Sequence, residues 1–400
     1  MAVTRRGFLR RVGVPPAEGM AGAVLAARGH EASLADAAQG RNRPLLPPGV
    51  DEVRINSNEN PLGPGPAVIR AIVGKFPEGG RYPFNSTPSD SNLAAAIASR
   101  HKVKPENIVL GGGSQEILKT TVRAFTSPSR GLVTASPSFE NPVNTAKRLN
   151  HPVVEVRVDS AFRLDLDPMI AASKGAGLVF VCNPNNPTGT VHGSQAIADF
   201  VRSVHRMSPD TAILIDEAYH EYVTDRAYAT AVPLALETPN VVVSRTFSKA
   251  YGMAGLRIGY GIGRAETITR LSALKMPYNI SVFSIAAALA AIEERAALDA
   301  ERARNTAVRG FTIKALREMG CRIADSQANF LFVDVHRPAK AFRDACAKSG
   351  VIVGRDFPPF EKTHARISVG TLDEMQKATT VFRSVLRSPA STTADVRSKE

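Results

Sequence analysis

The 400-residue sequence contains no tryptophan and three cysteines, and no apolar run in it is long enough to span a bilayer. The cysteines, Cys182, Cys321 and Cys346, form no C-x-x-C pair and have no metal-binding spacing, which excludes a thiolate metal site. Cys182 ends an apolar run and is expected to be a buried free thiol, whereas a Cys321–Cys346 disulfide would require an oxidising compartment. We therefore expect neither a membrane span nor a bound metal.

Charge of one sign dominates the sequence. The formal net charge is +13, although the apolar fraction of 44% and the charged fraction of 22% are ordinary for a soluble globular protein. A net positive charge of this size can favour binding to nucleic acid, to a membrane surface or to anionic substrates. The basic residues are scattered, without an aromatic-interleaved stripe, a zinc-finger spacing or an RNA-binding signature. We expect phosphate or carboxylate ligands and no nucleic-acid partner.

The first 40 residues differ from all that follow. The segment Thr4–Arg10 matches the twin-arginine export pattern, with a hydroxyl residue, two arginines, Phe-Leu and a basic residue. An Ala- and Gly-rich stretch follows, and Ala35–Ala37 offers a small-x-small cleavage site. Pro15 and Pro16 interrupt the middle of this segment. Two interpretations stay open: export to the periplasm by the twin-arginine route, or a basic tail on a cytoplasmic enzyme.

The stretch 244–260 carries the strongest chemical signal. It follows the apolar run Val241–Val243, which is typical of a buried strand. Lys249 is flanked by small and apolar residues, so its ammonium form is poorly solvated and its pKa should fall. A lysine of lowered pKa is the nucleophile that a Schiff base requires. The hydroxyls of Thr246 and Ser248 and the guanidinium of Arg257 suit a phosphate. Together they indicate pyridoxal 5'-phosphate.

This motif resembles the lysine segment of fold-type I class I/II aminotransferases, in the form found in the histidinol-phosphate aminotransferase branch. The resemblance runs from about Ile55 to Thr371. It implies an α/β fold: a large domain with a mostly parallel, doubly wound sheet of seven strands, and a smaller α+β domain. The expected divisions are a leader (1–40), an N-terminal arm joining the small domain (41–80), the large domain (81–280), the small domain (281–388) and a tail (389–400).

A glycine turn between an apolar strand and a helix predicts an anion site. It comprises Gly111–Gly113 with Ser114 and Gln115, ahead of a helical pattern from Ile117. Free N–H groups and the helix dipole would face a phosphate there. The resemblance assigns Gly113, Ser114 and Gln115 to the cofactor phosphate. It also implies that Tyr82 reaches the phosphate in the neighbouring subunit's site, and hence a homodimer.

Three further segments place polar or aromatic groups just after apolar strands, where ligands of doubly wound sheets bind. Asn186 lies in a rigid Asn-Pro-Asn-Asn-Pro-Thr-Gly turn and should donate to the cofactor's 3-oxygen. Asp216 should pair with the protonated pyridine nitrogen, which makes the ring an electron sink. Tyr219 is then within reach of the 3-oxygen. Phe139 keeps the ring-stacking face of the family's usual tyrosine but lacks its hydroxyl; a core phenylalanine is the alternative.

Substrate-binding residues are implied by the resemblance alone. Asn58, in the Asn-Ser-Asn-Glu-Asn-Pro segment, and Asn329 match residues on the substrate side of the site. Arg366 matches the arginine that binds a substrate carboxylate or phosphate, and a guanidinium can hold either anion bidentately. Arg355 departs from the commoner form, in which the arginine directly follows the strand. The expected substrates are an amino donor and a 2-oxo acid.

The predicted activity is transamination, most like that between histidinol phosphate and 2-oxoglutarate, with Lys249, Asp216 and Tyr219 as catalytic residues. Several alternatives share every cofactor residue: a transaminase for aromatic or other amino acids, a decarboxylase and a carbon–sulfur lyase. A non-catalytic, cofactor-binding regulator is disfavoured, because the sequence carries no DNA-binding domain and the lysine, the acid and the arginines are intact.

Overall fold

The computed structural model of the chain describes residues 52–85 and 88–388. The twin-arginine-like segment, the small-residue cleavage site and the residues of the arm before Glu52 lie outside the described residues, as does the tail from residue 389. Within the described ranges, no helix is both long and apolar enough to cross a membrane.

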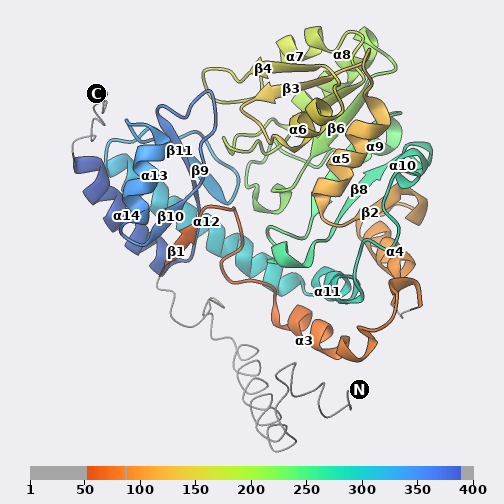
Figure 1. Ribbon diagram of the computed structural model, residues 1–400, viewed down its shortest axis with the longest axis horizontal. Helices are drawn as coiled ribbons and strands as arrows, with labels where there is room; N and C mark the ends of the chain where they lie inside the picture. Colours follow the sequence, from red (N-terminus) through yellow and green to blue (C-terminus); the bar gives the residue numbers. More distant parts are fainter. Residues whose placement is uncertain (1–51, 86–87, 389–400) are drawn as a thin grey trace, which may run out of the picture. The chain divides into compact units, whose positions relative to one another are not determined.

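A seven-stranded sheet forms the centre of the described chain (Figure 1). Its strands lie in the order β2-β8-β7-β6-β5-β3-β4, and all neighbours are parallel except those of β8, which is antiparallel to both β2 and β7. Most of its strands are short, continuous apolar runs, the pattern expected of strands buried on both faces. The predicted α/β fold with a mostly parallel sheet of seven strands is confirmed. The strands are β2 (Ile108–Gly111), β3 (Leu132–Ser136), β4 (Val153–Arg157), β5 (Leu178–Cys182), β6 (Ala212–Asp216), β7 (Val241–Thr246) and β8 (Gly259–Gly263).

Helices cover both faces of this sheet, because alternate strand residues point to opposite sides. On β5, for example, Val179 and Val181 belong to one apolar core, and Leu178 and Phe180 belong to the other. The first core is completed by α4 (Asp90–His101), α7 (Leu166–Ala172), α8 (Ser194–Met207), α9 (Val232–Glu237) and α11 (Val282–Glu293), and the second by α5 (Ser114–Phe125), α6 (Asn141–Arg148) and α10 (Ala265–Ser272).

A third core lies around two small sheets. Strand β1 (Val53–Ile55) from the N-terminal arm pairs in parallel with β10 (Val351–Val353), and β9 (Phe330–Asp334) pairs antiparallel with β11 (His364–Ser368). This core holds Leu331, Phe342 and Phe382 with under 1% of their surface exposed. The helices packed here are α12 (Arg295–Glu318), α13 (Ala339–Ala347) and α14 (Leu372–Arg387).

Helix α14 shows how sequence sets an element's start. The Thr371 hydroxyl accepts a hydrogen bond from the Glu374 amide, and the Glu374 carboxylate accepts one from the Thr371 amide at 2.7 Å. This reciprocal pair satisfies two amides that a helix's first turn leaves without partners. The remaining elements are α3 (Pro66–Gly74) and the 3₁₀ turns η1 (Phe76–Glu78), η2 (Pro83–Asn85), η3 (Pro105–Asn107), η4 (His220–Tyr222) and η5 (Ala254–Leu256).

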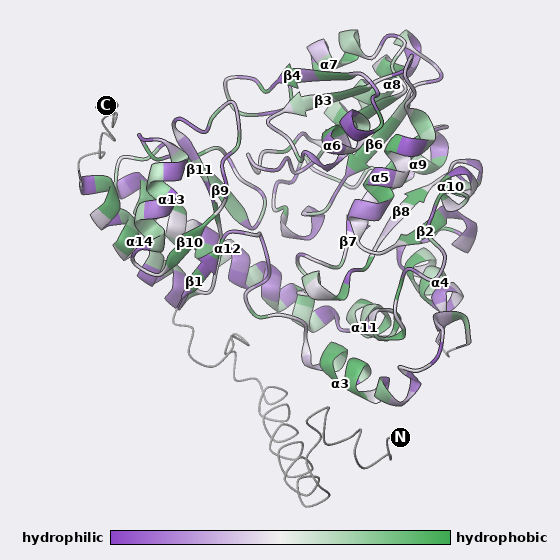
Figure 2. Cartoon of the chain, viewed as in Figure 1, coloured by the Kyte–Doolittle hydropathy of each residue, from purple (hydrophilic) through white to green (hydrophobic). Residues whose placement is uncertain are grey.

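Helices α11 and α12 are adjacent in the chain but have different surroundings. Figure 2 shows α11 as almost wholly hydrophobic and α12 as largely hydrophilic. Residues such as Ile285 and Ala288 of α11 pack in the first core of the large sheet, whereas Val308 and Leu316 of α12 pack in the third core. The expected domain boundary near residue 281 stays a prediction; the apolar contacts change at Glu294, between the two helices.

Two element ends differ from the expected ones, and a third decides where Asn329 lies. Helix α5 begins at Ser114 rather than Ile117, so Ser114 and Gln115 form its first turn. Strand β7 continues to Thr246, because Arg245 pairs with Tyr260 of β8 and Thr246 with Gly259. Strand β9 begins at Phe330, which leaves Asn329 in the preceding loop. Such ends depend on contacts between elements rather than on local residue pattern.

Candidate active site

A cavity of about 260 Å³ lies at the carboxyl ends of β5, β6 and β7. Residues at the strand ends of the large sheet line it, together with residues that follow β1 and β10 or lie on β11. The predicted site residues that line it are Asn58, Ser114, Gln115, Phe139, Asn186, Asp216, Tyr219, Thr246, Ser248, Lys249, Arg257, Arg355 and Arg366. The structure therefore brings together side chains that are up to 308 positions apart, as Asn58 and Arg366 are.

Lys249 lies three residues after the end of β7, with its amine directed into this cavity. Its Nζ donates to the Ser57 carbonyl at 3.1 Å and lies 5.8 Å from the centre of the Tyr219 ring. Burial, and after it the nearby Arg366 guanidinium, lower the pKa of this amine to about 8. A larger neutral fraction near physiological pH makes the amine a better nucleophile and base than an exposed lysine.

Asp216 ends β6 and has 2% of its surface exposed. Its Oδ1 has no hydrogen-bond partner among the described residues. Burial raises the pKa of this carboxyl to about 7. A buried carboxylate without a partner is costly, and a cationic ligand group would remove that cost. The geometry thus provides the counter-ion for a protonated ring nitrogen.

A connected set of polar groups lines the same cavity as Asp216. The Tyr219 hydroxyl accepts hydrogen bonds from the amides of Asn58 at 3.2 Å and Asn186 at 3.4 Å. The Asn186 side-chain oxygen accepts one from Arg366 at 2.9 Å. Burial raises the pKa of Tyr219, so its hydroxyl stays protonated and can donate to a ligand oxygen.

Another group of lining residues suits an anion. Arg257 donates to the Ser248 hydroxyl at 3.4 Å and to the Ala254 carbonyl at 2.8 Å, which fixes its guanidinium beside the first turn of α5. Gly113, at φ +85°, precedes that turn, and a Cβ there would lie 2.1 Å from the Arg257 Nη2. Only glycine permits both the positive φ and this close approach. The first amides of α5 and the guanidinium then suit a phosphate.

Three predicted site residues do not line the cavity. Gly113 lies behind Arg257, as described above. Asn329 is fully buried and donates from Nδ2 to the Asn58 carbonyl at 3.0 Å, so it supports the Asn58 segment rather than facing the cavity. Tyr82 is 65% exposed and stacks on Phe84 with ring centres 5.7 Å apart. Its predicted role concerns a second subunit and stays a prediction.

Sequence reasoning missed two charged residues that line the cavity, Glu59 and Glu140. The Glu140 carboxylate, just before α6, lies 2.5 Å from the Nη2 of Arg355 in the loop after β10. Arg355 also lies over the Phe357 ring at 4.2 Å, and Arg366 lies 4.8 Å from the same ring centre. The signal was available, because Glu140 directly follows the predicted stacking residue Phe139, but its partner is 215 positions away.

The comparisons with known proteins agree with this geometry. The profile of the family "Aminotransferase class I and II" matches residues 50–382. The chain belongs to the class I and II aminotransferases. This aminotransferase is 33% identical over 345 residues to histidinol-phosphate aminotransferase of Moorella thermoacetica, covering 84% of this chain and 86% of that protein. It is 36% identical over 348 residues to the corresponding protein of Akkermansia muciniphila, covering 84% and 90%.

A solved structure extends the similarity to the fold. Histidinol-phosphate aminotransferase from Sinorhizobium meliloti, in complex with pyridoxal-5'-phosphate, aligns with a TM-score of 0.76 at 27% identity, covering 84% of this chain and 90% of that chain. The aminotransferase described here is a pyridoxal-phosphate-dependent transaminase. When bound, that cofactor supplies an aldehyde that captures amines and a ring that stabilises negative charge at the substrate's α-carbon.

The residues present fit this cofactor. The unpartnered Asp216 Oδ1 would hold the protonated ring nitrogen, and the Tyr219 hydroxyl and Asn186 amide would donate to the ring oxygen. Arg257, Ser248 and the first turn of α5 would hold the phosphate, and the Lys249 amine would bind the aldehyde carbon. Phe139 lines the same cavity and also packs against the second core, so a stacking role and a core role are both met by its position.

Proposed function

We propose that this transaminase moves an amino group between histidinol phosphate and 2-oxoglutarate. The observation that carries the proposal is the pair of arginines, Arg366 and Arg355, in the cavity that holds Lys249. The curated relatives of similar length that carry the name histidinol-phosphate aminotransferase support it. Two guanidinium groups beside one cavity suit a substrate with a phosphate or a second carboxylate.

The two arginines differ in how the protein holds them. Arg366 is buried, donates to Asn186 and to the Asn56 carbonyl at 2.7 Å, and leaves its Nε without a partner among the described residues. Burial lowers the pKa of this guanidinium to about 10. Arg355 is half exposed and is paired with Glu140. Arg366 is therefore the fixed anion receptor, and Arg355 must exchange Glu140 for substrate.

The chain's own residues then divide the work of the reaction. Arg366 orients the donor by its anionic group, which brings the α-carbon toward Lys249. The neutral Lys249 amine would remove the proton from that carbon as a general base and, once protonated, would give it as a general acid to the cofactor carbon that receives the amino group. Asp216 keeps the ring nitrogen cationic, and Tyr219 holds its own proton toward the ring oxygen. Arg257 and the α5 amides keep the phosphate end fixed throughout.

A substrate panel tests the proposal. Purified holoenzyme with 2-oxoglutarate should convert histidinol phosphate to its oxo product and glutamate, with a higher kcat/KM than for free aromatic or aliphatic amino acids. Higher kcat/KM with an aromatic amino acid would assign the chain to that class of transaminase instead. Release of CO2 or of a thiol, without new glutamate, would assign decarboxylation or carbon–sulfur cleavage and overturn the proposal.

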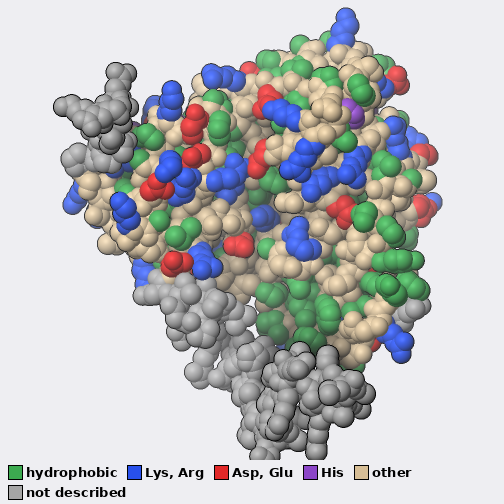
Figure 3. Space-filling model, in the orientation of Figure 1, with side chains coloured by type: hydrophobic (Ala, Val, Ile, Leu, Met, Phe, Trp, Pro, Cys, Tyr) green, Lys and Arg blue, Asp and Glu red, His purple; other side chains and the backbone are tan. Residues whose placement is uncertain are grey.

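We also propose a homodimer in which Tyr82 reaches the partner's cofactor phosphate. Exposed aromatic side chains cluster beside α3 and α11: Tyr82, Phe84 and Tyr278 contact one another with ring centres 5.0–5.8 Å apart. Figure 3 shows hydrophobic side chains gathered on the face over these helices. Exposed apolar clusters of this kind mark protein interfaces. Sedimentation should give a dimer. Tyr82→Phe should weaken cofactor binding without dissociating the dimer. An active enzyme that is monomeric would contradict this proposal.

Export by the twin-arginine route is a separate proposal, and it rests on the pattern at Thr4–Arg10 alone. Export is unusual for an enzyme of amino-acid biosynthesis, so an exported protein would point to a secreted metabolite or peptide as substrate. Cell fractionation and N-terminal sequencing of the mature protein test it. Replacing Arg5 and Arg6 with lysine should retain the protein in the cytoplasm if the route is used; a full-length cytoplasmic wild-type protein would contradict the proposal.

A further inference from the structure

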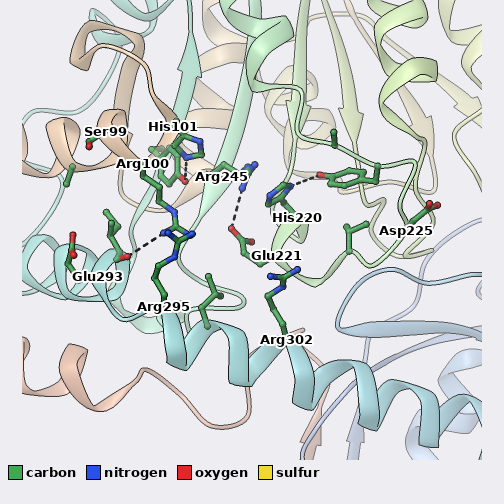
Figure 4. Close-up of a pocket in the computed structure, with 17 residues that line it drawn as sticks. Ser99, Arg100, His101, His220, Glu221, Asp225, Arg245, Glu293, Arg295 and Arg302 are labelled. Carbon is green, nitrogen blue, oxygen red and sulfur yellow. Dashed lines mark hydrogen bonds and ion pairs between the residues drawn. The ribbon is translucent and has the colours of Figure 1, made fainter.

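A second cavity, of about 670 Å³, opens between the end of α4, the turn η4 and the start of α12 (Figure 4). Among the described residues, it shares no lining residue with the cavity around Lys249. Its volume falls within the range of small-molecule sites in proteins. Nothing in the transamination chemistry uses its residues.

The floor of this cavity is polar and internally paired. Arg245 of β7 donates to the Glu217 carboxylate at 2.8 Å and to Glu221 at 3.3 Å. Two imidazoles stand beside this group: His101 is hydrogen-bonded to the Tyr260 hydroxyl at 3.0 Å, and His220 to the Tyr228 hydroxyl at 3.1 Å. A floor whose groups already have partners is a rigid support rather than a second charged ligand.

The mouth of the cavity carries positive charge, and two of its three arginines have no acidic partner among the described residues. Three arginines frame it: Arg100 from α4, and Arg295 and Arg302 from α12. Figure 4 shows Arg100 and Arg295 directed toward one another and Arg302 directed toward Glu221 and His220. Arg295 has no hydrogen-bond or ion-pair partner among the described residues, and Arg100 has a single long contact there, to the Ile292 carbonyl at 3.4 Å. Arg302 forms an exposed ion pair with Asp299, which lies outside the lining, at 3.5 Å. Converging guanidinium groups repel one another unless an anion lies between them.

The acidic residues of the lining do not neutralise these arginines. Glu221 is engaged by Arg245, and the Asp225 carboxylate accepts a hydrogen bond from the Ala227 amide at 2.9 Å. Glu293 lies at the exposed rim. Burial lowers the pKa of His220 to about 2, and Arg245, His101, Arg302 and Arg100 act in the same direction. The surrounding cations therefore add to the effect of burial on this imidazole.

We propose that this cavity binds a small anion carrying two or more phosphate or carboxylate groups, held between Arg100, Arg295 and Arg302. Guanidinium groups provide paired donors in a plane, which match phosphate and carboxylate oxygens. The cavity is open enough for the arginine side chains to close around such a ligand, and the neutral imidazoles can donate to it. The site is independent of the substrate assigned to the Lys249 cavity.

Calorimetric titration of the holoenzyme tests the proposal, with inorganic pyrophosphate and citrate as separate ligands. Holoenzyme is used so that the cofactor's own phosphate site is filled. Arg295→Gln and Arg100→Gln should each weaken binding about tenfold, the loss expected for one charge-assisted contact. Arg206→Gln, at an exposed arginine in the last turn of α8 outside the cavity, should leave it unchanged. A difference between pyrophosphate and citrate identifies the preferred anionic group.

Two results would overturn the proposal. One is the absence of binding by wild-type holoenzyme to either anion at low ionic strength. The other is binding that persists in Arg295→Gln and Arg100→Gln but is lost in Arg366→Gln, because that would place the anion in the substrate site. As a separate readout, a bound anion should raise the pKa of His220. The pH dependence of the His220 NMR signal, recorded with and without pyrophosphate, measures this change.

Discussion

Two consecutive carboxylates at the end of β6, Asp216 and Glu217, face opposite sides of the same sheet. Asp216 points into the cofactor cavity, and its Oδ1 has no partner among the described residues. Glu217 accepts hydrogen bonds from Arg245, the Thr230 hydroxyl and the Ala231 amide at 2.6–2.8 Å. Both are nearly fully buried. The difference is that the fold satisfies one acid and leaves the other for a ligand.

The same contrast separates the arginines. Arg245 is fully enclosed by Glu217, Glu221 and Thr230, and those two acids raise the pKa of its guanidinium despite its burial. Arg366 is buried but has an unpartnered Nε, and burial lowers its pKa to about 10. Buried charge that the protein pairs internally supports the fold, whereas buried charge left incomplete marks where a ligand binds.

The largest effect should come from Lys249→Ala. Loss of the amine removes both the group that binds the cofactor aldehyde and the base that moves the α-proton. Turnover of any amino donor should fall by at least about four orders of magnitude. Circular dichroism should show an intact fold, because Lys249 makes one hydrogen bond in the described chain. Retained turnover in this variant would contradict the assignment of the whole cavity.

In the internally paired network around Glu217, Arg245→Met should lower the free energy of unfolding rather than the turnover. It leaves Glu217 and Glu221 buried without their cation, a change that costs about 3–5 kcal/mol. Denaturant unfolding of the holoenzyme should show this loss. The exposed Arg206→Met, in the last turn of α8, is the control and should differ from wild type by less than about 0.5 kcal/mol. Equal stability of the two variants would show that the Arg245 network is dispensable.

The Glu140–Arg355 pair should tune substrate choice. Glu140→Gln keeps the shape of the side chain but frees Arg355 for substrate. Both groups are more than a third exposed, so a change of about fivefold in KM is expected rather than a larger one. KM for histidinol phosphate should fall, and KM for alanine, which lacks a second anion, should not. Asp344→Asn removes a comparable exposed pair elsewhere, with Lys340, and should change neither. A parallel change for both donors would contradict the idea.

The smallest expected effect is a shift in the pH dependence of cofactor capture. The pKa of Lys249 is lowered from its ordinary value to about 8, so the amine gains a proton as the pH falls below that value. The rate at which apoenzyme captures pyridoxal phosphate should therefore rise with pH and level off above about 8. Arg366→Gln removes a charge that lowers this pKa, and should move the midpoint to higher pH. Stopped-flow absorbance measures both; a rate independent of pH would contradict the lowered pKa.

Much of the fold and of the cavity could be predicted from sequence because strand ends and rigid turns are local patterns. Lys249, Asp216 and Asn186 each follow an apolar strand, and parallel strands bring their carboxyl ends to one edge. The contacts that could not be predicted depend on the direction of a side chain or on a partner far away in the sequence. Asn329 donates to the Asn58 backbone instead of facing the cavity, and Glu140 pairs with Arg355, which is 215 positions away. The pairing of Glu217 with Arg245 was not predicted either, because the two residues are 28 positions apart and no local pattern links them.

The account is tested most directly by measuring Asp216→Asn and Glu217→Gln side by side, for turnover and for apoenzyme stability against pH. The raised pKa of Asp216 means that folded apoenzyme holds a proton that the unfolded chain releases, so stability falls as pH rises toward about 7. Asp216→Asn should abolish that fall and lose turnover by orders of magnitude. Glu217→Gln should lose stability and keep most of its turnover. The reverse pattern, with Asp216→Asn active and unstable, would contradict the account.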